Sequence, residues 1–304
     1  MPWVDISYTP PIRSACFCWR YIFICQCIVP LNVHFVLAQV SGIDVPAVMS
    51  TWTQQMGYPY LTVVSEQWAA DSVTIELEQT WFLADGSVDD SSADKIWTIP
   101  LLFATSSTVS DAAVLMTGKR QTFRITLSGP NDWVKVNAGQ HALVRVAHSP
   151  AMITRLVAPV TDKSLSPVDR ASLLLDAYAL AKAGVAPVEG VVNLLRAFVN
   201  EDNFSVWGAI QGVLLGLHSL MEQVGGDAYT AYLGFGASIV KRALDTFGWE
   251  HKVTDDHSDK LLRTTVISLL DVFGGMDETI LAEARRRFDA HWEDPSALHS
   301  DFKV

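Results

Sequence analysis

The sequence predicts an α+β protein of more than one domain, in which a small antiparallel β-sandwich precedes an all-α helical solenoid. The chain has 304 residues, and domains commonly hold roughly 100–200 residues, so two or three domains are expected. Apolar and polar residues alternate between residues 59 and 148, as in half-buried strands. From residue 149 to 304 apolar residues recur every three or four positions, as in helices.

The composition excludes two broad classes of protein. Lys and Arg total 22 against 33 Asp and Glu, which gives a formal net charge of −11. A chain this acidic lacks the basic face that displaces counterions from phosphates, so no nucleic-acid partner is expected. Hydrophobic residues make up 49% and charged residues 18%, which supplies a large core and argues against global disorder.

An apolar leader, residues 1–40, comes first. It holds all the cysteines of the chain: Cys16, Cys18, Cys25 and Cys27. Structural disulfides of a secreted domain would be spread through the fold, so we expect unpaired thiols and a cytoplasmic location. A metal site on the two C-x-C pairs is less favoured, because paired zinc ligands are usually separated by about two to four residues. Arg20 and Pro30 interrupt the apolar run, so association with a membrane through the leader is the alternative and not the favoured interpretation.

A helix is expected over residues 43–56, before the first strand. Its apolar residues, among them Val48 and Trp52, are three or four positions apart and share one face. Gly57 ends this helix and Pro59 prevents its continuation.

Short strands separated by turns are expected next. The run VTIELE at 73–78 alternates strictly. The same pattern recurs in segments 61–63, 96–103, 123–127, 133–136 and 143–146. Turn-forming residues fill segments 84–94, 117–120 and 128–132. Strands of this length and spacing favour an antiparallel sandwich of about ninety residues.

The remainder of the chain predicts helices. Ser166 can cap a helix, Pro167 suits its first position, and Asp169 complements the free amides and the helix dipole. Further helices are expected at 188–199, 204–223, 227–247, 258–273 and 277–291. The short connections place neighbouring helices antiparallel, in a bundle or a solenoid. No fixed repeat length is present in the sequence, so an irregular solenoid is preferred.

Five motifs follow one another in an order that points to one family. They are VMSTWTQQMGYP at 48–59, DWVKVNAG at 132–139, LSPVDR at 165–170, AFVNE at 197–201 and ARRRF at 284–288. With these motifs residues 41–295 resemble zinc aminopeptidases of the gluzincin type. The resemblance implies that residues 41–58 end a catalytic-type domain, that 59–148 form its small β domain, and that 149–304 form part of its C-terminal helical domain.

Structural roles are enough to explain why the motif residues are present in this sequence. They are Trp52, Gln55, Gly57, Tyr58, Pro59, Trp133, Asn137, Gly139, Pro167, Asp169 and Arg170. Trp52 and Tyr58 are expected to be apolar anchors. Asp169 is expected to serve as a helix cap, and Arg170 to form an ion pair between helices.

Two departures from the family pattern affect what the resemblance implies. The family usually places a Tyr-Arg pair where this chain has Val144-Arg145, so any role of that tyrosine hydroxyl is absent. Arg145 is expected to form a salt bridge at a strand end, and a position facing a substrate chamber is the alternative. The chain also begins where the family's catalytic domain is nearly finished, and the family's helical domain runs well beyond residue 304. We therefore expect a C-terminal portion with both ends cut.

The resemblance implies zinc-dependent removal of N-terminal residues from peptides in the intact family, with the helical domain closing a chamber over the substrate. The zinc motif H-E-x-x-H places two His one helical turn apart beside a Glu base. None of the eight histidines is followed by Glu: His34, His141, His148, His218, His251, His257, His291 and His299. The family's G-A-M-E-N loop is missing too, and GGMDE at 274–278 resembles it only superficially. We therefore expect no catalytic residue, metal ligand or cofactor in this chain, and no aminopeptidase activity of the chain alone.

Two interpretations remain to be weighed, a possible metal site and a function of a different class. The densest set of metal-binding residue types is expected to be a solvated inter-helix connection: Glu250, His251, Asp255, Asp256 and His257. The expected partners are peptides or the missing catalytic half. A function of a different class is a stand-alone helical solenoid that binds peptides or proteins on its surface.

Overall fold

The computed structural model describes residues 42–87, 95–110, 112–299 and 302. The predictions for the apolar leader and its four cysteines lie outside the described residues. The chain divides into two compact units, Met1–Pro159 with Asp176–Gly190 and Val160–Leu175 with Val191–Val304. We call these the first and the second unit.

The first unit begins with helix α3 (Val45–Thr53). The Asp44 side chain accepts a 3.1 Å hydrogen bond from the amide of Ala47, which satisfies one of the free donors at the helix start. Four residues of the predicted apolar face are buried, namely Val45, Val48, Met49 and Trp52, whereas Met56 lies beyond the helix end and is exposed. The helix ends three residues earlier than predicted, and the chain then turns at Gly57 with φ of +91°.

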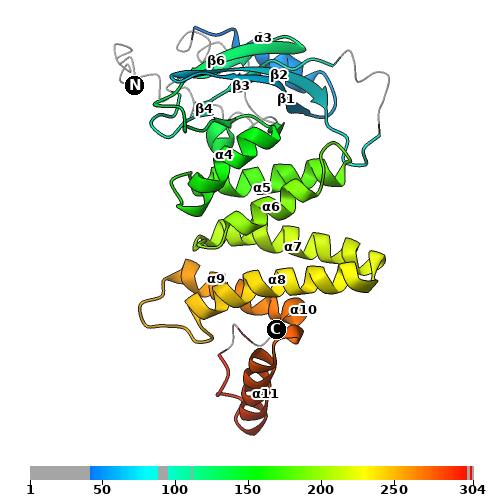
Figure 1. Cartoon of the computed structure of the whole chain (residues 1–304), viewed down its shortest axis with the longest axis vertical. Coiled ribbons are helices and arrows are strands. Elements are labelled where there is room, and N and C mark those ends of the chain that lie inside the picture. The colour runs from blue at the N-terminus through cyan, green and yellow to red at the C-terminus, as the bar shows by residue number, and fades with distance from the viewer. Residues whose placement is uncertain (1–41, 88–94, 111, 300–301, 303–304) are drawn as a thin grey trace, which may run out of the picture. The chain divides into compact units, whose positions relative to one another are not determined.

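A four-stranded sheet forms the main β element of this unit, with strand order β6-β2-β1-β8 (Figure 1). Its strands are β1 (Pro59–Trp68), β2 (Ser72–Trp81), β6 (Arg120–Thr126) and β8 (Arg145–Ala147). β1 pairs with β2, and β2 with β6, in the predicted antiparallel sense. β8 instead pairs with β1 in parallel, so the prediction of antiparallel pairing is wrong for this pair. No hairpin joins β8 to β1, and only a hairpin fixes the direction of a partner strand from local sequence.

Two short ladders complete the β part of the described chain. β3 (Ile99–Leu101) pairs with β5 (Val114–Met116), and β4 (Phe103–Ala104) pairs with β7 (Lys135–Val136). The segment predicted as one strand, 96–103, is therefore divided between two ladders. Side chains from the sheet and from both ladders share one hydrophobic core, which includes Leu61, Ile75, Trp97, Met116 and Val136.

Helix α4 (Pro150–Thr161) was not predicted from the sequence, whereas α5 (Pro167–Lys182) was. The Ser149 hydroxyl accepts a 3.1 Å hydrogen bond from the amide of Met152, so α4 starts with a serine cap. α5 contributes residues to both units.

The second unit is helical in its described part (Figure 1). Its elements are α6 (Glu189–Ala197), α7 (Phe204–Val224), α8 (Gly226–Phe247), α9 (His257–Ser268), α10 (Leu270–Phe273), the 3-10 turn η3 (Gly274–Met276) and α11 (Glu278–Glu293). The helix predicted over 258–273 is split at Leu269 into α9 and α10. α7 and α8 lie side by side, and the Tyr232 hydroxyl donates a 2.6 Å hydrogen bond to the carbonyl of Leu214.

By length and composition alone, α7 is long and apolar enough to cross a membrane, the one such helix in the described part. One face of α7 is buried, and the helix packs against α8 and α9. A core helix of this kind accounts for the apolar composition.

A pair of glycines on α8 gives a matched test of helix packing. A Cβ at Gly236 would lie 2.3 Å from Cε1 of Phe273, and that ring is buried. Gly236→Ala is therefore expected to lower the free energy of unfolding by about 1–3 kcal/mol through overpacking, despite the better helix propensity of alanine. Gly234→Ala is the control, because nothing lies within 4 Å of its added Cβ, and it is expected to stabilise by about 0.5–1 kcal/mol. Urea denaturation measures both, and changes of the same sign would contradict this account.

Candidate functional site

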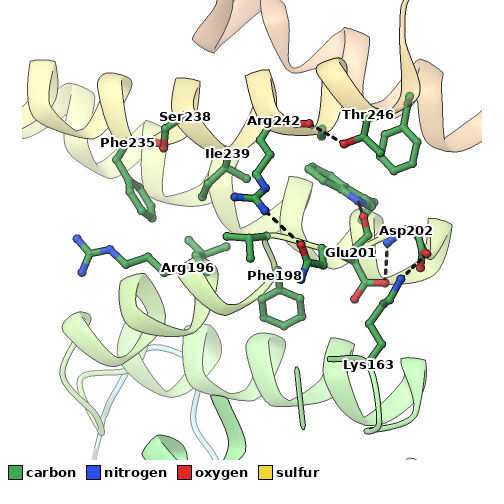
Figure 2. Close-up of a pocket in the computed structure, with 16 residues that line it drawn as sticks. Lys163, Arg196, Phe198, Glu201, Asp202, Phe235, Ser238, Ile239, Arg242 and Thr246 are labelled. Carbon is green, nitrogen blue, oxygen red and sulfur yellow. Dashed lines mark hydrogen bonds and ion pairs between the residues drawn. The ribbon is translucent and has the colours of Figure 1, made fainter. Parts of the chain in front are cut away.

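The second unit contains a cavity of about 530 Å³ between α8 and the connection from α6 to α7 (Figure 2). It is lined by Lys163, by the segment 195–202, by Trp207 and by one face of α8 from Phe235 to Phe247. The residues that α8 contributes are three or four positions apart, so a single helical face runs along the cavity.

Glu201 fixes the shape of this wall. Arg170 donates two hydrogen bonds to its carboxylate, of 2.7 and 2.8 Å, and both side chains are buried. The same carboxylate accepts hydrogen bonds from the amides of Asp202 (3.1 Å) and Asn203 (2.9 Å). The Trp207 indole donates a 3.0 Å hydrogen bond to the Glu201 carbonyl. The ion pair predicted for Arg170 is present, but its partner lies in the connection between α6 and α7 and not on a second helix, so the prediction of a pair between helices is wrong in that respect. Glu201 is also one of the residues that line the cavity.

Two guanidinium groups face this cavity from opposite elements (Figure 2). Arg242 on α8 donates a 3.3 Å hydrogen bond to the side-chain oxygen of Asn200. Arg196 on α6 lies 5.6 Å from the ring centroid of Phe235. Within the described part of the chain neither arginine forms an ion pair with a carboxylate, although the protein is acidic overall.

The lining of this cavity combines cationic, aromatic and polar side chains. Guanidinium groups bind carboxylates in two-pronged geometry, and the aromatic side chains around them offer apolar contact. Neither histidine nor cysteine is found among the described residues that line the cavity.

Arg145 lies at the start of β8 in the first unit. Its Nη1 is 3.1 Å from Oδ1 of Asp176, and its guanidinium lies 5.3 Å from the ring centroid of Phe82. The amide of Val146 donates a 3.1 Å hydrogen bond to the other oxygen of Asp176. The salt bridge predicted for Arg145 at a strand end is therefore confirmed.

Buried charged groups around Asp176 were missed by sequence reasoning. Burial raises the pKa of Asp176 to about 6, which outweighs the opposing effects of Lys135 and Arg145. Burial, together with the charge of Lys135, lowers the pKa of His148 well below its ordinary value. Lys135 is fully buried between valines in a strand. The alternation at 133–136 assigns Lys135 to the polar face of its strand, so the sequence pattern does not predict that this charge is buried.

The motif residues near α3 form the junction between that helix and the β core. Trp52 is buried in the core and its indole donates a 2.9 Å hydrogen bond to the carbonyl of Thr98. The ring of Tyr58 lies 5.5 Å from that of Phe82. Both predicted anchors are confirmed. Gln55 donates a 3.0 Å hydrogen bond to the Ile96 carbonyl, which ties the end of α3 to the same core.

The other motif residues shape the backbone. Asn137 has a left-handed conformation, φ of 56°, and its side chain exchanges hydrogen bonds of 3.0 Å with the amide and carbonyl of Ala142. Gly139 also has a positive φ, of 68°. The Ser166 hydroxyl donates a 2.7 Å hydrogen bond to Asp169, and the Asp169 amide donates one of 3.2 Å in return, so the predicted cap is present. Pro59 starts β1, Pro167 starts α5, and Trp133 is buried.

The residues present do not fit the zinc site of the aminopeptidases. The sequence has no H-E-x-x-H, and in the described part no three His, Cys, Asp or Glu side chains gather as metal ligands would. The densest such set in the sequence pairs with arginines instead. Arg263 forms an ion pair with Asp255 and a 3.1 Å hydrogen bond with His251, while Arg287 pairs with Glu250 at 2.7 Å. The Asp256 side chain caps α9.

The fold and these junctions agree with what comparison with known proteins shows. Residues 133–303 match the ERAP1-like C-terminal domain family. The match covers more than half of the chain, and the chain belongs to this family.

Particular relatives are aminopeptidases. The chain is 27% identical over 270 residues to the puromycin-sensitive aminopeptidase of Caenorhabditis elegans, an alignment that covers 88% of this chain and 28% of the relative. It is 29% identical over 268 residues to aminopeptidase M1-B of Oryza sativa subsp. japonica, over 85% of this chain and 29% of the relative. It is 28% identical over 269 residues to aminopeptidase 2 of Candida albicans, over 88% of this chain and 28% of the relative. The resemblance stated from the motifs is thus confirmed, and the chain spans under a third of the length of these relatives.

Proposed function

We propose that this chain is the β-domain and helical substrate-chamber portion of a zinc aminopeptidase and has no aminopeptidase activity by itself. The observation that carries the proposal is the family match combined with the absence of H-E-x-x-H from the sequence. In this proposal zinc and the attacking water belong to a catalytic half, and this chain supplies wall and scaffold. Its partners would be peptides or that catalytic half.

The proposed domain organisation follows the motifs. Residues 1–40 are an unmatched leader, 41–58 end a catalytic-type domain, 59–148 are a β-sandwich, and 149–304 are part of a helical solenoid. The common core of the four-stranded sheet and the two ladders supports the sandwich. The succession α7, α8 and α9, each packed on the others, supports the solenoid. We also propose a cytoplasmic location, with membrane association through the leader as the alternative.

The purified chain, supplied with zinc, is expected not to hydrolyse aminoacyl-coumarin substrates. The physical reason is that no pair of histidines one helical turn apart is present to hold the ion beside a Glu base. Fluorescence release measures hydrolysis, with a full-length puromycin-sensitive aminopeptidase as the positive control. Turnover by the chain that a chelator abolishes would overturn the proposal.

A stand-alone interaction module is the second candidate. It is favoured by the cavity with two arginines that lack carboxylate partners in the described part of the chain. It is also favoured by the exposed, stacked rings of Phe288 and Trp292 on α11, 6.2 Å apart. Sedimentation of the purified chain with and without a catalytic half of a relative separates the candidates. Association with that half supports the chamber role, and association with peptides alone supports the module.

A further inference from the structure

The first unit has an open strand edge. β6 is the terminal strand of the four-stranded sheet, so only one of its edges pairs with β2. The amide of Leu127 donates to the carbonyl of Asp71 (2.8 Å), and this register directs the backbone bonds of the odd-numbered residues toward β2. The even-numbered residues direct their amides and carbonyls to the open edge, where the described part of the chain offers them no backbone partner: Thr122, Arg124 and Thr126.

A groove follows this edge. A cavity of about 380 Å³ is lined on one side by the consecutive residues 121–126 and on the other by Phe103, Thr105, Thr108, Ser110 and Val114. Phe103 and Phe123 pack together beneath it, with ring centroids 5.3 Å apart. The volume lies within the range of roughly 300–1,000 Å³ that is usual for binding clefts.

The wall opposite β6 is held in place by its own hydrogen bonds. The amide of Ser110 donates to the carbonyl of Phe103 (2.8 Å), and the Ser110 hydroxyl accepts from the amide of Phe103 (3.1 Å). The amide of Thr105 donates to the carbonyl of Thr108 (2.8 Å). These hydrogen bonds lie within the wall and do not involve the backbone of β6.

The charge along this edge selects the kind of strand that can pair with it. Arg124 is exposed, donates a 3.2 Å hydrogen bond to the Ser72 hydroxyl, and has no ion pair in the described part of the chain. Arg120 already pairs with Glu78 at 2.8 Å. A second copy of β6 would bring like charges together, and such edge charges oppose pairing between copies. A strand with carboxylates on the same face would instead pair with Arg124.

We propose that the open edge of β6 binds an extended acidic peptide by strand addition. The peptide's backbone bonds to Thr122, Arg124 and Thr126, its carboxylates lie beside Arg124, and its alternate apolar side chains enter the groove over Phe103 and Phe123. This binding surface lies in the first unit and is independent of the chamber role proposed above.

The test uses the full chain and a fluorescent hexapeptide of alternating glutamate and valine, with binding measured by anisotropy. Arg124→Glu is expected to weaken binding at least about 10-fold, because attraction becomes repulsion. Thr122→Pro is expected to do the same, since its amide points away from β2 and proline removes only an open-edge donor. Arg285→Glu on α11 is the matched charge control, with less than about a 2-fold effect expected because the proposed binding surface includes no residue of the second unit.

Peptide methylation separates strand addition from simple charge attraction. Methylating the alternate amides that face β6 should abolish binding, whereas methylating the other set should leave it unchanged. Equal binding of both methylated peptides would overturn the proposal, and so would wild-type affinity of both Arg124→Glu and Thr122→Pro. A dimer of the chain that Thr122→Pro dissociates would assign the edge to a second copy and would also overturn it.

Discussion

Replacing Glu201 with alanine is expected to lower the free energy of unfolding of the second unit by about 3–5 kcal/mol. The substitution leaves the Arg170 guanidinium buried with a single carbonyl acceptor, at Leu165, and without its counter-charge. It also removes the acceptor for the amides of Asp202 and Asn203. Hydrogen exchange of the α6 and α7 amides, followed by mass spectrometry, measures the loss as faster opening of these helices.

Two further variants separate a buried charge pair from a surface one. Asp202→Ala removes the neighbouring ion pair between Asp202, whose side chain is 57% exposed, and Lys163, whose side chain is 35% exposed. It should lower the free energy of unfolding by only about 0–1 kcal/mol. The double replacement of Arg170 by methionine and Glu201 by leucine should restore more than about half of the loss, because no unpaired charge remains buried. A Glu201→Ala variant as stable as the Asp202→Ala control would contradict the assigned role.

If this prediction holds, the cavity wall depends on a carboxylate that is buried and already bonded to Arg170 and to two backbone amides. The Glu201 side chain is turned to Arg170, while the adjacent Asn200 positions Arg242. The ion pair therefore holds the segment whose Asn200 accepts the hydrogen bond from Arg242. In the Glu201→Ala variant, the binding of peptides to this cavity, proposed above for the interaction module, should then be lost together with the stability of the second unit.

The sequence predicted the elements whose local signals agree with one another. Ser166, Pro167 and Asp169 predicted the start of α5, and strict alternation at 73–78 predicted the centre of β2. Ser149 and Pro150 are the same signal at the start of α4, yet that helix was not predicted. Pro159 lies inside α4, and an internal proline usually argues against a helix.

Long-range features were beyond local patterns. The parallel pairing of β8 with β1 joins residues about 85 positions apart along the chain, and no periodicity specifies such a partner. The cavity arginines Arg196 and Arg242 lie on different helices, so nothing in sequence spacing brings them together. An ion pair could be predicted for Arg170 as a residue type at a helix start, but its partner Glu201 depends on tertiary packing.

Asp176 gives the second large effect, a dependence of stability on pH. Its pKa is raised to about 6 in the folded protein by burial, above the value of about 3.9 expected in the unfolded chain. Its contribution to the free energy of unfolding is therefore fully present below about pH 4 and is lost as the pH rises through about 6. From pH 4 to 7.5 the loss amounts to about 2–3 kcal/mol. Asp176→Asn lacks this titration, so it should gain about that much stability relative to wild type over the same interval.

Urea denaturation followed by tryptophan fluorescence at several pH values measures this difference. Asp132→Asn is the matched control of opposite sign. Burial raises the pKa of Asp132, but hydrogen bonds from Ser128 and Ser106 outweigh it and lower the pKa to about 2. The Asp132 contribution is therefore present above about pH 4 and is lost as the pH falls toward 2, so its asparagine variant loses stability relative to wild type as the pH rises. If Asp176→Asn behaved in the same way, the ion pair with Arg145 would outweigh the burial of the carboxylate, and Asp176 would be an ordinary salt-bridge partner that stabilises β8.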